Sequence, residues 1–484
     1  MISLHEKEVS FKDLERSMYE IGCEIAAELL KRYLEKLDKE ISHTRDKELY
    51  RHKGIRKRTI KTLMGEVNIS RRIYQVTNEE GVKEHRYLLD EAMGLKVIGS
   101  ISANLAERIA QDITKTSFRN VAESVSQLTN QPISHTGVWN IVQEIGQRQK
   151  ESERTLVAAY KNEQLQGSRE VNLLFEEADG VWISLQGKSR PKSGRGKKEL
   201  KIGCTYEGWQ PRYSGSPEYQ TVNKHSVAGM MNSQDFHAVK EANLAQTYNL
   251  DEIQYRILNG DGASWIKQVH DIDDTLHYQL DPYHLSRAVT RNVSNKQAAN
   301  HIRNWLKTGQ TAKALQKIHA LKYECDGLAS HIKKLEMLEK YIEHQEAYLI
   351  PYQSRPELTL PAAPEGITYR NLGTMESQVA GYAARMKGGR SWSEQGADHL
   401  AKIIALKNSP SFLQTISQLL EGQLSLPMSE QITVYVHQTS RTIKQHLPAV
   451  RQGGRPFGGQ KSTNGRKAIQ QYLDLKSFTD LIYR

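Results

Sequence analysis

The 484-residue chain contains no uninterrupted apolar run of about 18 residues, which is the length that a helix needs to cross a membrane. Its first twenty residues carry charges where a secretory signal would have an apolar core. Both absences predict a cytoplasmic protein with no membrane partner. Cysteine is scarce: Cys23, Cys204 and Cys325 lie far apart and form no CxxC pair. This spacing argues against a disulfide framework and against a zinc knuckle.

Basic residues are abundant and unevenly distributed. The formal net charge is +11 at pH 7 and the pI is about 9.2, which favours a polyanionic partner. Residues 45–72 hold ten Lys or Arg against three acids, next to an alternating run that predicts a small β element. We therefore prefer nucleic-acid contact to a merely solvated surface for this segment. The candidate contacts are Arg56, Lys57, Arg58, Arg71 and Arg72.

The C-terminal part of the chain repeats this bias. Residues 431–473 contain no Asp or Glu and seven Lys or Arg, several of them in a Gly-rich stretch. Such a composition predicts a segment that is disordered alone and that orders on phosphates.

Residues 117–147 predict a helix-turn-helix unit. Val121, Val125 and Leu128 form one helical stripe, and TNQP then interrupts the helix. Ser134 is placed to cap a second helix, in which the stripe continues at Val138, Ile141 and Ile145. An αα-hairpin in a bundle fits the same pattern, and the basic neighbouring segment favours DNA binding. Ser134 and His135, at the start of the second helix, are the candidate DNA contacts.

From about residue 169 the pattern changes to strands separated by helices, which indicates an α/β layer. Residues 292–349 are helical and polar, and a proline-rich stretch ends them. The predicted organisation has six parts. They are 1–85, an N-terminal helix and a basic β element; 86–165, helix-turn-helix-like; 166–290, the first part of the catalytic core; 291–365, an all-α insertion; 366–430, the second part of the core; and 431–484, a basic tail.

Acidic residues stand at the ends of two predicted strands, Asp179 in LLFEEADGVWISLQ and Asp261 in YRILNGDGASW. Strand ends that meet at one sheet edge bring such carboxylates together, and a divalent cation would relieve their repulsion. Oxygen ligands without Cys or clustered His favour Mg²⁺ or Mn²⁺ over zinc. Glu376, near a helix start, is the candidate third acid, although a solvent-exposed glutamate is the simpler interpretation of that residue alone. Glu177 is the reserve for the first acid.

The segments EADGVWISLQ, GDGASWI, DPYHLSR and MESQVAGYAARMKGGRSWSEQGA together resemble the ISLre family of bacterial insertion-sequence transposases, which is related to the Mutator type. The resemblance covers nearly the whole chain. It implies an α/β fold with an RNase H-like mixed-sheet core interrupted by an all-α insertion, behind a mainly helical N-terminal DNA-binding region. It also implies that Asp179, Asp261 and Glu376 form a DDE triad holding two metal ions.

DPYH matches a motif of Mutator-like enzymes and makes Asp281 and His284 supporting candidates, although Asp281 before Pro282 is also a favoured helix start. Arg385, Lys387 and Arg390 are candidate phosphate contacts. Trp392 is either a core residue, which we favour, or a stacking platform for an extruded base.

These features predict a transposase that binds the terminal inverted repeats of its element, cuts there and joins the ends to target DNA. It would act as a homo-oligomer on double-stranded DNA, associated with the bacterial nucleoid. A metal-dependent nuclease without strand transfer, and a catalytically inactive DNA-binding regulator, are the alternatives.

Overall fold

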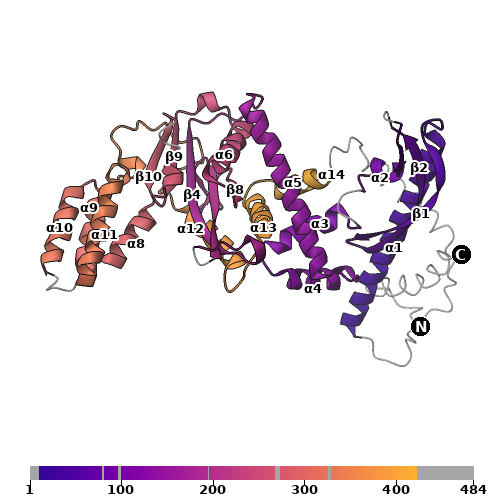
Figure 1. The fold of residues 1–484 in the computed structure, drawn as a ribbon, viewed down its shortest axis with the longest axis horizontal. Coiled ribbons are helices and arrows are strands. Elements are labelled where there is room, and N and C mark those ends of the chain that lie inside the picture. The colour runs from indigo at the N-terminus through magenta and orange to yellow at the C-terminus, as the bar shows by residue number, and fades with distance from the viewer. Residues whose placement is uncertain are drawn as a thin grey trace, which may run out of the picture. The chain divides into compact units, whose positions relative to one another are not determined.

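The computed structural model describes residues 10–78, 81–95, 100–193, 196–267, 273–324 and 329–421. The basic tail predicted at 431–484, and Cys325, lie outside the described residues. The chain divides into two compact units, which are described separately (Figure 1). The first unit comprises Met1–Ala106, Glu123–Ile133 and Leu420–Arg484, and the second comprises Glu107–Ala122 and Ser134–Leu419.

The first unit packs a long helix on a small antiparallel sheet. Helix α1 (Phe11–Thr44) is followed by strands β1 (Arg51–Thr62), β2 (Gly65–Thr77) and β3 (Lys83–Arg86), in that order across the sheet, and by the short helix α2 (Leu88–Ala92). The basic β element predicted from the sequence is therefore confirmed. Alternate residues of β2 point inward, as expected for a sheet with one buried face. The core between this sheet and its helices contains Leu34, Ile60, Val67, Ile69 and Leu89.

Three helices follow: α3 (Ala103–Ile113), α4 (Phe118–Thr129) and α5 (His135–Lys161). The predicted cap of α5 is confirmed, because Ser134 Oγ accepts a hydrogen bond from the backbone N–H of Gly137 at 3.0 Å. The predicted stripe of α4 is right at Val121 and Val125, which are buried, and wrong at Leu128, whose surface is 43% exposed.

A five-stranded mixed sheet forms the centre of the second unit. Its strands are β4 (Leu173–Ser184), β5 (Lys197–Tyr206), β8 (His225–Gly229), β9 (Tyr255–Gly260) and β10 (Leu276–Leu280). Their order across the sheet is β10-β9-β4-β5-β8. The pairs β4/β5 and β5/β8 are antiparallel, whereas β4/β9 and β9/β10 are parallel. A two-stranded ribbon joins β6 (Trp209–Pro211) to β7 (Tyr219–Thr221).

Helices border both sides of this sheet (Figure 1). Helix α6 (Ser233–Thr247) packs Phe236 and Val239 against Ala178, Leu258 and Tyr278 on one face. Helix α12 (Thr374–Met386) contacts β4, and α13 (Glu394–Lys407) lies against β8 and α5. Two further helices are α7 (Ser264–Lys267) and α14 (Phe412–Glu421).

The predicted helical segment is present. Helices α8 (Pro282–Asn292), α9 (Lys296–Lys307), α10 (Thr311–Glu324) and α11 (Ala329–Gln345) share one apolar core, which includes Leu285, Ile302, Ile318 and Leu338. The protein is thus a mixed α/β protein.

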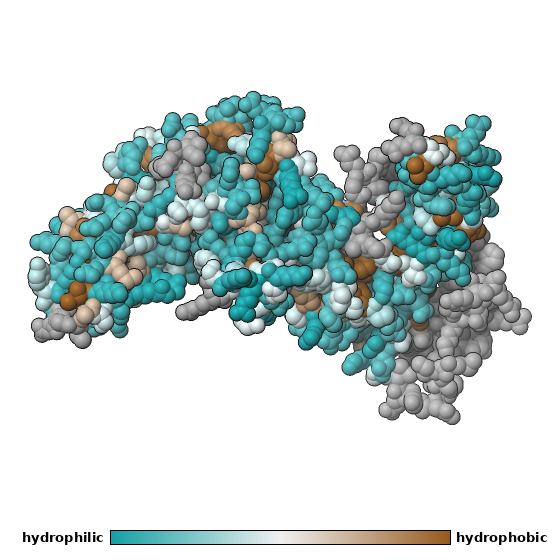
Figure 2. All heavy atoms as spheres, in the orientation of Figure 1, coloured by the Kyte–Doolittle hydropathy of each residue, from teal (hydrophilic) through white to brown (hydrophobic). Residues whose placement is uncertain are grey.

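In the part of the chain that the structure describes, no helix is long and apolar enough to cross a membrane. On the face that Figure 2 shows, hydrophobic residues are scattered among a hydrophilic majority, as expected for a chain of which 25% of the residues are charged.

Candidate active site

The three parallel strands at one side of the sheet deliver one aspartate each to the same row. Ala178 of β4 pairs with Gly260 of β9, and Gly260 pairs with Leu280 of β10. The next residue in each strand direction is an aspartate: Asp179, Asp261 and Asp281. The backbone N–H of Asp281 donates to the carbonyl of Gly260 at 2.8 Å, so the pairing continues past the ends of β9 and β10. Neighbouring strands lie about 4.8 Å apart, which places the three carboxylates side by side.

Asp179 is a buried acid without a compensating lysine or arginine among the described ion pairs. Its residue surface is only 8% exposed. Burial raises its pKa, a hydrogen bond from the N–H of Gly180 at 2.6 Å opposes this, and the charge of Asp261 raises it further, to about 6. His284 lies nearby, with Nε2 3.8 Å from Asp179 Oδ2.

Asp281 has two roles in the geometry. It is the N-cap of α8, because a side-chain oxygen accepts from the N–H of Tyr283 at 2.8 Å and Pro282 occupies the first helical position. Burial also raises the pKa of Asp281. The first turn of α8 brings His284 to Asp179. The capping and the site interpretations of DPYH are therefore compatible.

The loop after Asp261 is closely packed. Asp261 accepts a hydrogen bond from the N–H of Ala263 at 2.9 Å, and Gly262 has a φ of +96°, which favours glycine. A Cβ atom at Gly262 would lie 2.9 Å from Gln345 Nε2, at the end of α11. Tyr341 of the same helix is also close, since burial and the charges of Asp261 and Asp281 raise its pKa to about 12. The end of α11 therefore borders the row.

A second row, one pleat earlier, is a buried polar ladder that the sequence did not reveal. Glu177, Asn259 and Gln279 are paired in register and are at most 2% exposed. Asn259 Nδ2 donates to Glu177 at 3.3 Å, and Gln279 Nε2 donates to Asn259 Oδ1 at 3.2 Å. From the sequence, the two-residue spacing predicted only that Glu177 and Asp179 lie on the same face of their strand.

Glu177 fixes the start of α12. Its carboxylate accepts from the backbone N–H groups of Gly373, Thr374 and Met375 at 3.3, 2.9 and 3.1 Å, and from Tyr206 Oη at 2.5 Å. A carboxylate at a helix N-terminus is stabilised by the unpaired N–H groups and by the helix dipole. With its oxygens committed in this way, Glu177 does not serve as the reserve for the first acid.

Glu376 is exposed in the first turn of α12. The N–H of the preceding residue, Met375, is bonded to Glu177, two residues from Asp179 on β4. The helix therefore begins beside the aspartate row, but none of the hydrogen bonds or ion pairs found among the described residues joins Glu376 to it. Its place in a triad stays a prediction.

The predicted DNA contacts separate into two groups. Arg56 and Lys57 are exposed on β1. Arg58 and Arg71 instead pair with the buried Asp90 at 2.6 and 2.7 Å, and the guanidinium of Arg71 stacks 3.9 Å from the Tyr87 ring. Arg72 pairs with the buried Asp38 at 2.5 Å. The latter three hold the small sheet together.

A similar division holds at the end of α12. Arg385 is 5% exposed, and its Nε donates to the carbonyl of Ile113 at 2.7 Å; burial lowers its pKa to about 10. A phosphate contact by Arg385 is therefore unsupported. Lys387 and Arg390 are exposed, and Arg390 donates to the carbonyl of Ala384 at 3.0 Å. Trp392 is a core residue, as favoured, with Nε1 donating to Met386 at 2.8 Å.

The row suits a hard divalent cation in donor type and charge, because Asp179 and Asp261 offer oxygen ligands and the pKa of Asp179 shows an uncompensated buried charge. The described side chains are not, however, arranged as a set of metal ligands. Within the ranges that the structure describes, no group of three or more His, Cys, Asp or Glu side chains is arranged to hold an ion.

Taken together, these elements define a mixed α/β protein with an acidic row where β9 and β10 end beside Asp179 of β4. Residues 4–415 match the family described as "Uncharacterised protein family (UPF0236)". The chain therefore belongs to the UPF0236 family.

Named relatives carry the same designation. The chain is 25% identical to a "UPF0236 protein in vanSb 3'region" of Streptococcus gallolyticus, over 83% of each chain. It is 22% identical to two UPF0236 proteins of Caldanaerobacter subterraneus subsp. tengcongensis, over 60% of this chain in both cases. In these two comparisons the chain covers 56% and 58% of the relative's length.

These findings correct the identification made from the sequence. The family that matches is UPF0236, and the names of these relatives contain no reference to a transposase or to ISLre. The assignment to the ISLre family is therefore wrong. Short segments spread over a long chain do not by themselves fix a family.

Proposed function

We propose that this protein is a metal-dependent DNA strand-cleaving and strand-joining enzyme, a transposase by activity. The observation that carries the proposal is the row of Asp179, Asp261 and Asp281 beside His284, at the sheet edge where the parallel strands β9 and β10 end and β4 runs on to Ser184. Carboxylates gathered at such an edge, with the pKa of one raised, are typical of a catalytic site rather than of a core.

We also propose that the five-stranded sheet is an RNase H-like core and that α9–α11 are an insertion in it. Three antiparallel strands are followed along the chain by two that run parallel to the first, which is the strand pattern of that fold. The helical segment lies between β10 and α12, so the chain leaves the sheet and returns to it before Glu376.

The ion would be Mg²⁺ or Mn²⁺, held by Asp179, Asp261 and Glu376. When bound, such ions lower the pKa of an attacking hydroxyl and neutralise charge on the phosphodiester oxygens. The protein's own residues orient the reacting groups. His284 borders Asp179, Asp281 lies next to Asp261 in the row, and the Glu177 ladder fixes the helix that carries Glu376.

The partner in this proposal is double-stranded DNA, and the exposed bases Arg56 and Lys57 of β1 would contact its phosphates. Each phosphate contact contributes about 0.9 to the slope of log affinity against log salt concentration. Arg56→Ala/Lys57→Ala should reduce this slope by about two. Lys12→Ala/Lys39→Ala, which removes equal charge from exposed positions of α1, is the matched control. An equal change in both variants would mean that only net charge matters.

The name of one relative supports the proposal that the coding sequence moves within a genome. The protein of Caldanaerobacter subterraneus subsp. tengcongensis that is 22% identical to this chain over 289 residues is named with eleven locus designations. A sequence that copies itself to new places in a genome would produce such a name.

The decisive experiment uses the full chain and duplex DNA taken from the flanks of its own gene. The wild-type protein is expected to nick this DNA at defined ends and to join those ends to a target plasmid, only when Mg²⁺ or Mn²⁺ is added. Asp179→Asn and Asp261→Asn should lower both rates on the order of 10³-fold while DNA binding persists, because the acids would hold the metal ion and do not grip the duplex.

Three outcomes would contradict the proposal. Cleavage without joining would establish a nuclease, and binding with neither reaction would establish a DNA-binding regulator. Full activity of Asp179→Asn would place the reaction elsewhere in the molecule.

A further inference from the structure

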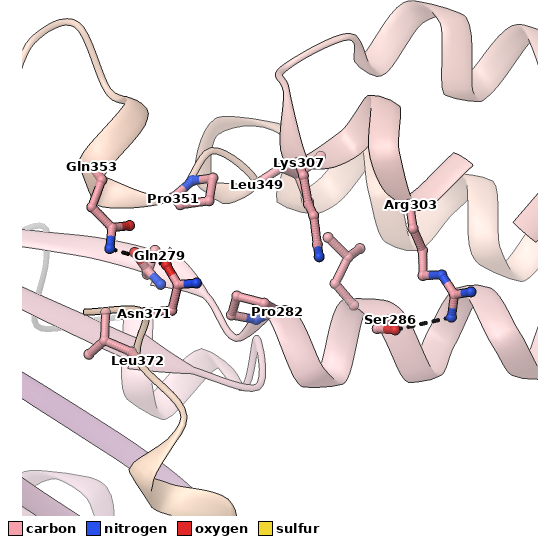
Figure 3. A pocket seen from close by; sticks show the side chains of 11 residues that line it. Gln279, Pro282, Ser286, Arg303, Lys307, Leu349, Pro351, Gln353, Asn371 and Leu372 are labelled. Carbon is pink, nitrogen blue, oxygen red and sulfur yellow. Dashed lines mark hydrogen bonds between the residues drawn. The ribbon is translucent and has the colours of Figure 1, made fainter. Parts of the chain in front are cut away.

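A pocket of about 160 Å³ opens beside α8, next to the aspartate row (Figure 3). Pro282 follows Asp281 directly, and Leu285 and Ser286 lie on the same face of α8, three and four residues further on. The lining residues are Gln279, Pro282, Leu285, Ser286, Arg303, Lys307, Leu349, Pro351, Gln353, Asn371 and Leu372.

The pocket has the size of a single chemical group. Its 160 Å³ is well below the roughly 300–1,000 Å³ of pockets that enclose a whole drug-sized ligand, so a complete cofactor would not fit. Its walls are apolar where Leu285, Leu349 and Leu372 meet Pro282 and Pro351. Such walls suit a flat ring system.

Positive charge borders this apolar wall. Arg303 lines the pocket and donates to Ser286 Oγ at 3.3 Å and Thr290 Oγ1 at 3.0 Å, both neutral groups. Lys307, one turn later on α9, is exposed, and its side chain extends toward the pocket in Figure 3. Neither residue forms an ion pair with an acid that the structure describes. An anionic group at the pocket mouth would therefore be stabilised.

Amide groups are available on the opposite wall. Gln353 Nε2 donates to Asn371 Oδ1 at 3.1 Å, which orients the two side chains side by side. This bond leaves the carbonyl of Gln353 as an acceptor and the amide of Asn371 as a donor, the pair with which such side chains bind a base edge. Gln279 is committed, since it donates to Asn259 and accepts from the N–H of Tyr352 at 3.0 Å.

We propose that this pocket takes one unpaired nucleotide of the DNA strand held at the aspartate row, with the base between the Leu and Pro side chains and the adjoining phosphate at Arg303 and Lys307. The inference rests on the proposed function, because it supplies the strand. Enzymes that carry out chemistry on a base extrude its nucleotide, and they hold the base by stacking on apolar side chains and by hydrogen bonds to its edge. This pocket offers both kinds of contact.

The test measures the affinity of the full chain for two duplexes of the same sequence. One carries a single bulged adenine and the other a bulged abasic residue at that position. Stacking of one base is worth about 1–3 kcal/mol, so the wild-type protein should bind the base-containing bulge about tenfold more tightly. Ser286→Leu, which fills the pocket from α8, should abolish this preference.

Thr290→Leu is the matched control. Thr290 also accepts a hydrogen bond from Arg303, but it lies one turn further along α8 and does not line the pocket. This variant should keep the preference. Lys307→Ala should weaken binding of both duplexes several-fold, whereas Lys296→Ala, at the exposed start of α9, should not. Thermal melting checks that each variant is folded.

Three results would overturn the inference. These are equal affinity of the wild-type protein for the two duplexes, a preference that Ser286→Leu retains, and a preference that Thr290→Leu loses as fully as Ser286→Leu does. In each case cleavage at defined ends would still support the proposed function. Absence of DNA binding even at low salt would instead contradict the proposed function, and the inference with it.

Discussion

Glu176 and Asp179 lie three residues apart on β4, and both are buried, but their surroundings are opposite. Glu176 pairs with Lys240 at 2.5 Å and with Arg256 at 2.6 Å. Burial acts to raise its pKa, but these two cations outweigh it and lower the pKa to about 2. Asp179 has two acids nearby, and burial and the charge of Asp261 raise its pKa to about 6.

The two faces of one strand therefore serve different purposes. Glu176 points to the face covered by α6, where Lys240 and Arg256 compensate its charge and the network stabilises the fold. Asp179 points to the opposite face of β4, and no lysine or arginine pairs with it among the described side chains. His284 Nε2 lies 3.8 Å from its Oδ2. A buried charge that the fold leaves uncompensated is better explained by binding than by stability.

The largest expected effect separates these roles by stability. Glu176→Gln removes the fully buried acid of this network and leaves Lys240 and Arg256 with Glu241, which pairs with them at 3.4 and 2.7 Å. The cost should therefore lie near the lower end of the about 3–5 kcal/mol that breaking a buried pair costs. Asp179→Asn removes a charge that repels its neighbours, so the free energy of unfolding should stay constant or rise. Urea unfolding followed by tryptophan fluorescence measures this, since all six tryptophans lie in the second unit.

Lys296→Gln, an exposed substitution on α9, is the control for handling and expression and should change the free energy of unfolding by less than about 0.5 kcal/mol. If Asp179→Asn were as destabilising as Glu176→Gln, Asp179 would be a structural acid and the contrast would fail.

Acid should remove the contribution of Glu176. Its pKa is about 4.5 when unfolded and about 2 when folded, so the carboxylate stabilises the fold fully above pH 4.5. This contribution, about 3 kcal/mol for a shift of that size, is lost as the pH falls from 4.5 toward 2. The difference in unfolding free energy between wild type and Glu176→Gln should therefore shrink over this range. A difference that stays constant between pH 5 and pH 3 would contradict the assignment.

The sequence predicted the parts of this contrast that depend on neighbours along the chain. The acids in the apolar runs of β4 and β9 predicted that Asp179 and Asp261 meet, and the helix start at Pro282 predicted the position of Asp281. The strand end expected at Asp179 was wrong, because β4 continues to Ser184. The sequence did not predict the ion pairs and hydrogen bonds between residues that lie far apart along the chain. Asp90 lies 32 residues from Arg58, and nothing local shows that this arginine is held in an ion pair.

The same limit explains two other sites. Glu177 appeared as a spare acid because its partners, the first N–H groups of α12, follow it by 196 to 198 residues. Arg385 appeared as a phosphate contact because the carbonyl of Ile113, which accepts from it, is 272 residues away. Local pattern gives a side chain's position on its own strand or helix, whereas compensation of its charge depends on the whole fold.

The smallest expected effect concerns Asp281, which belongs to both sides of the contrast because it caps α8 and ends the aspartate row. Asp281→Ser keeps a cap oxygen, so stability should stay near that of the wild type, whereas Asp281→Ala should lose about 1 kcal/mol. Both variants remove the carboxylate beside Asp261. If that carboxylate helps to orient the site, both should lower DNA cleavage by about 10–100-fold, as loss of a supporting group at a metal site does. Asp281→Ser would then lose activity and keep its stability, whereas Asp281→Ala would lose both. Wild-type cleavage by that variant would assign Asp281 to the fold, as a helix cap, and leave Asp179 and Asp261 as the acids of the row that act in the reaction.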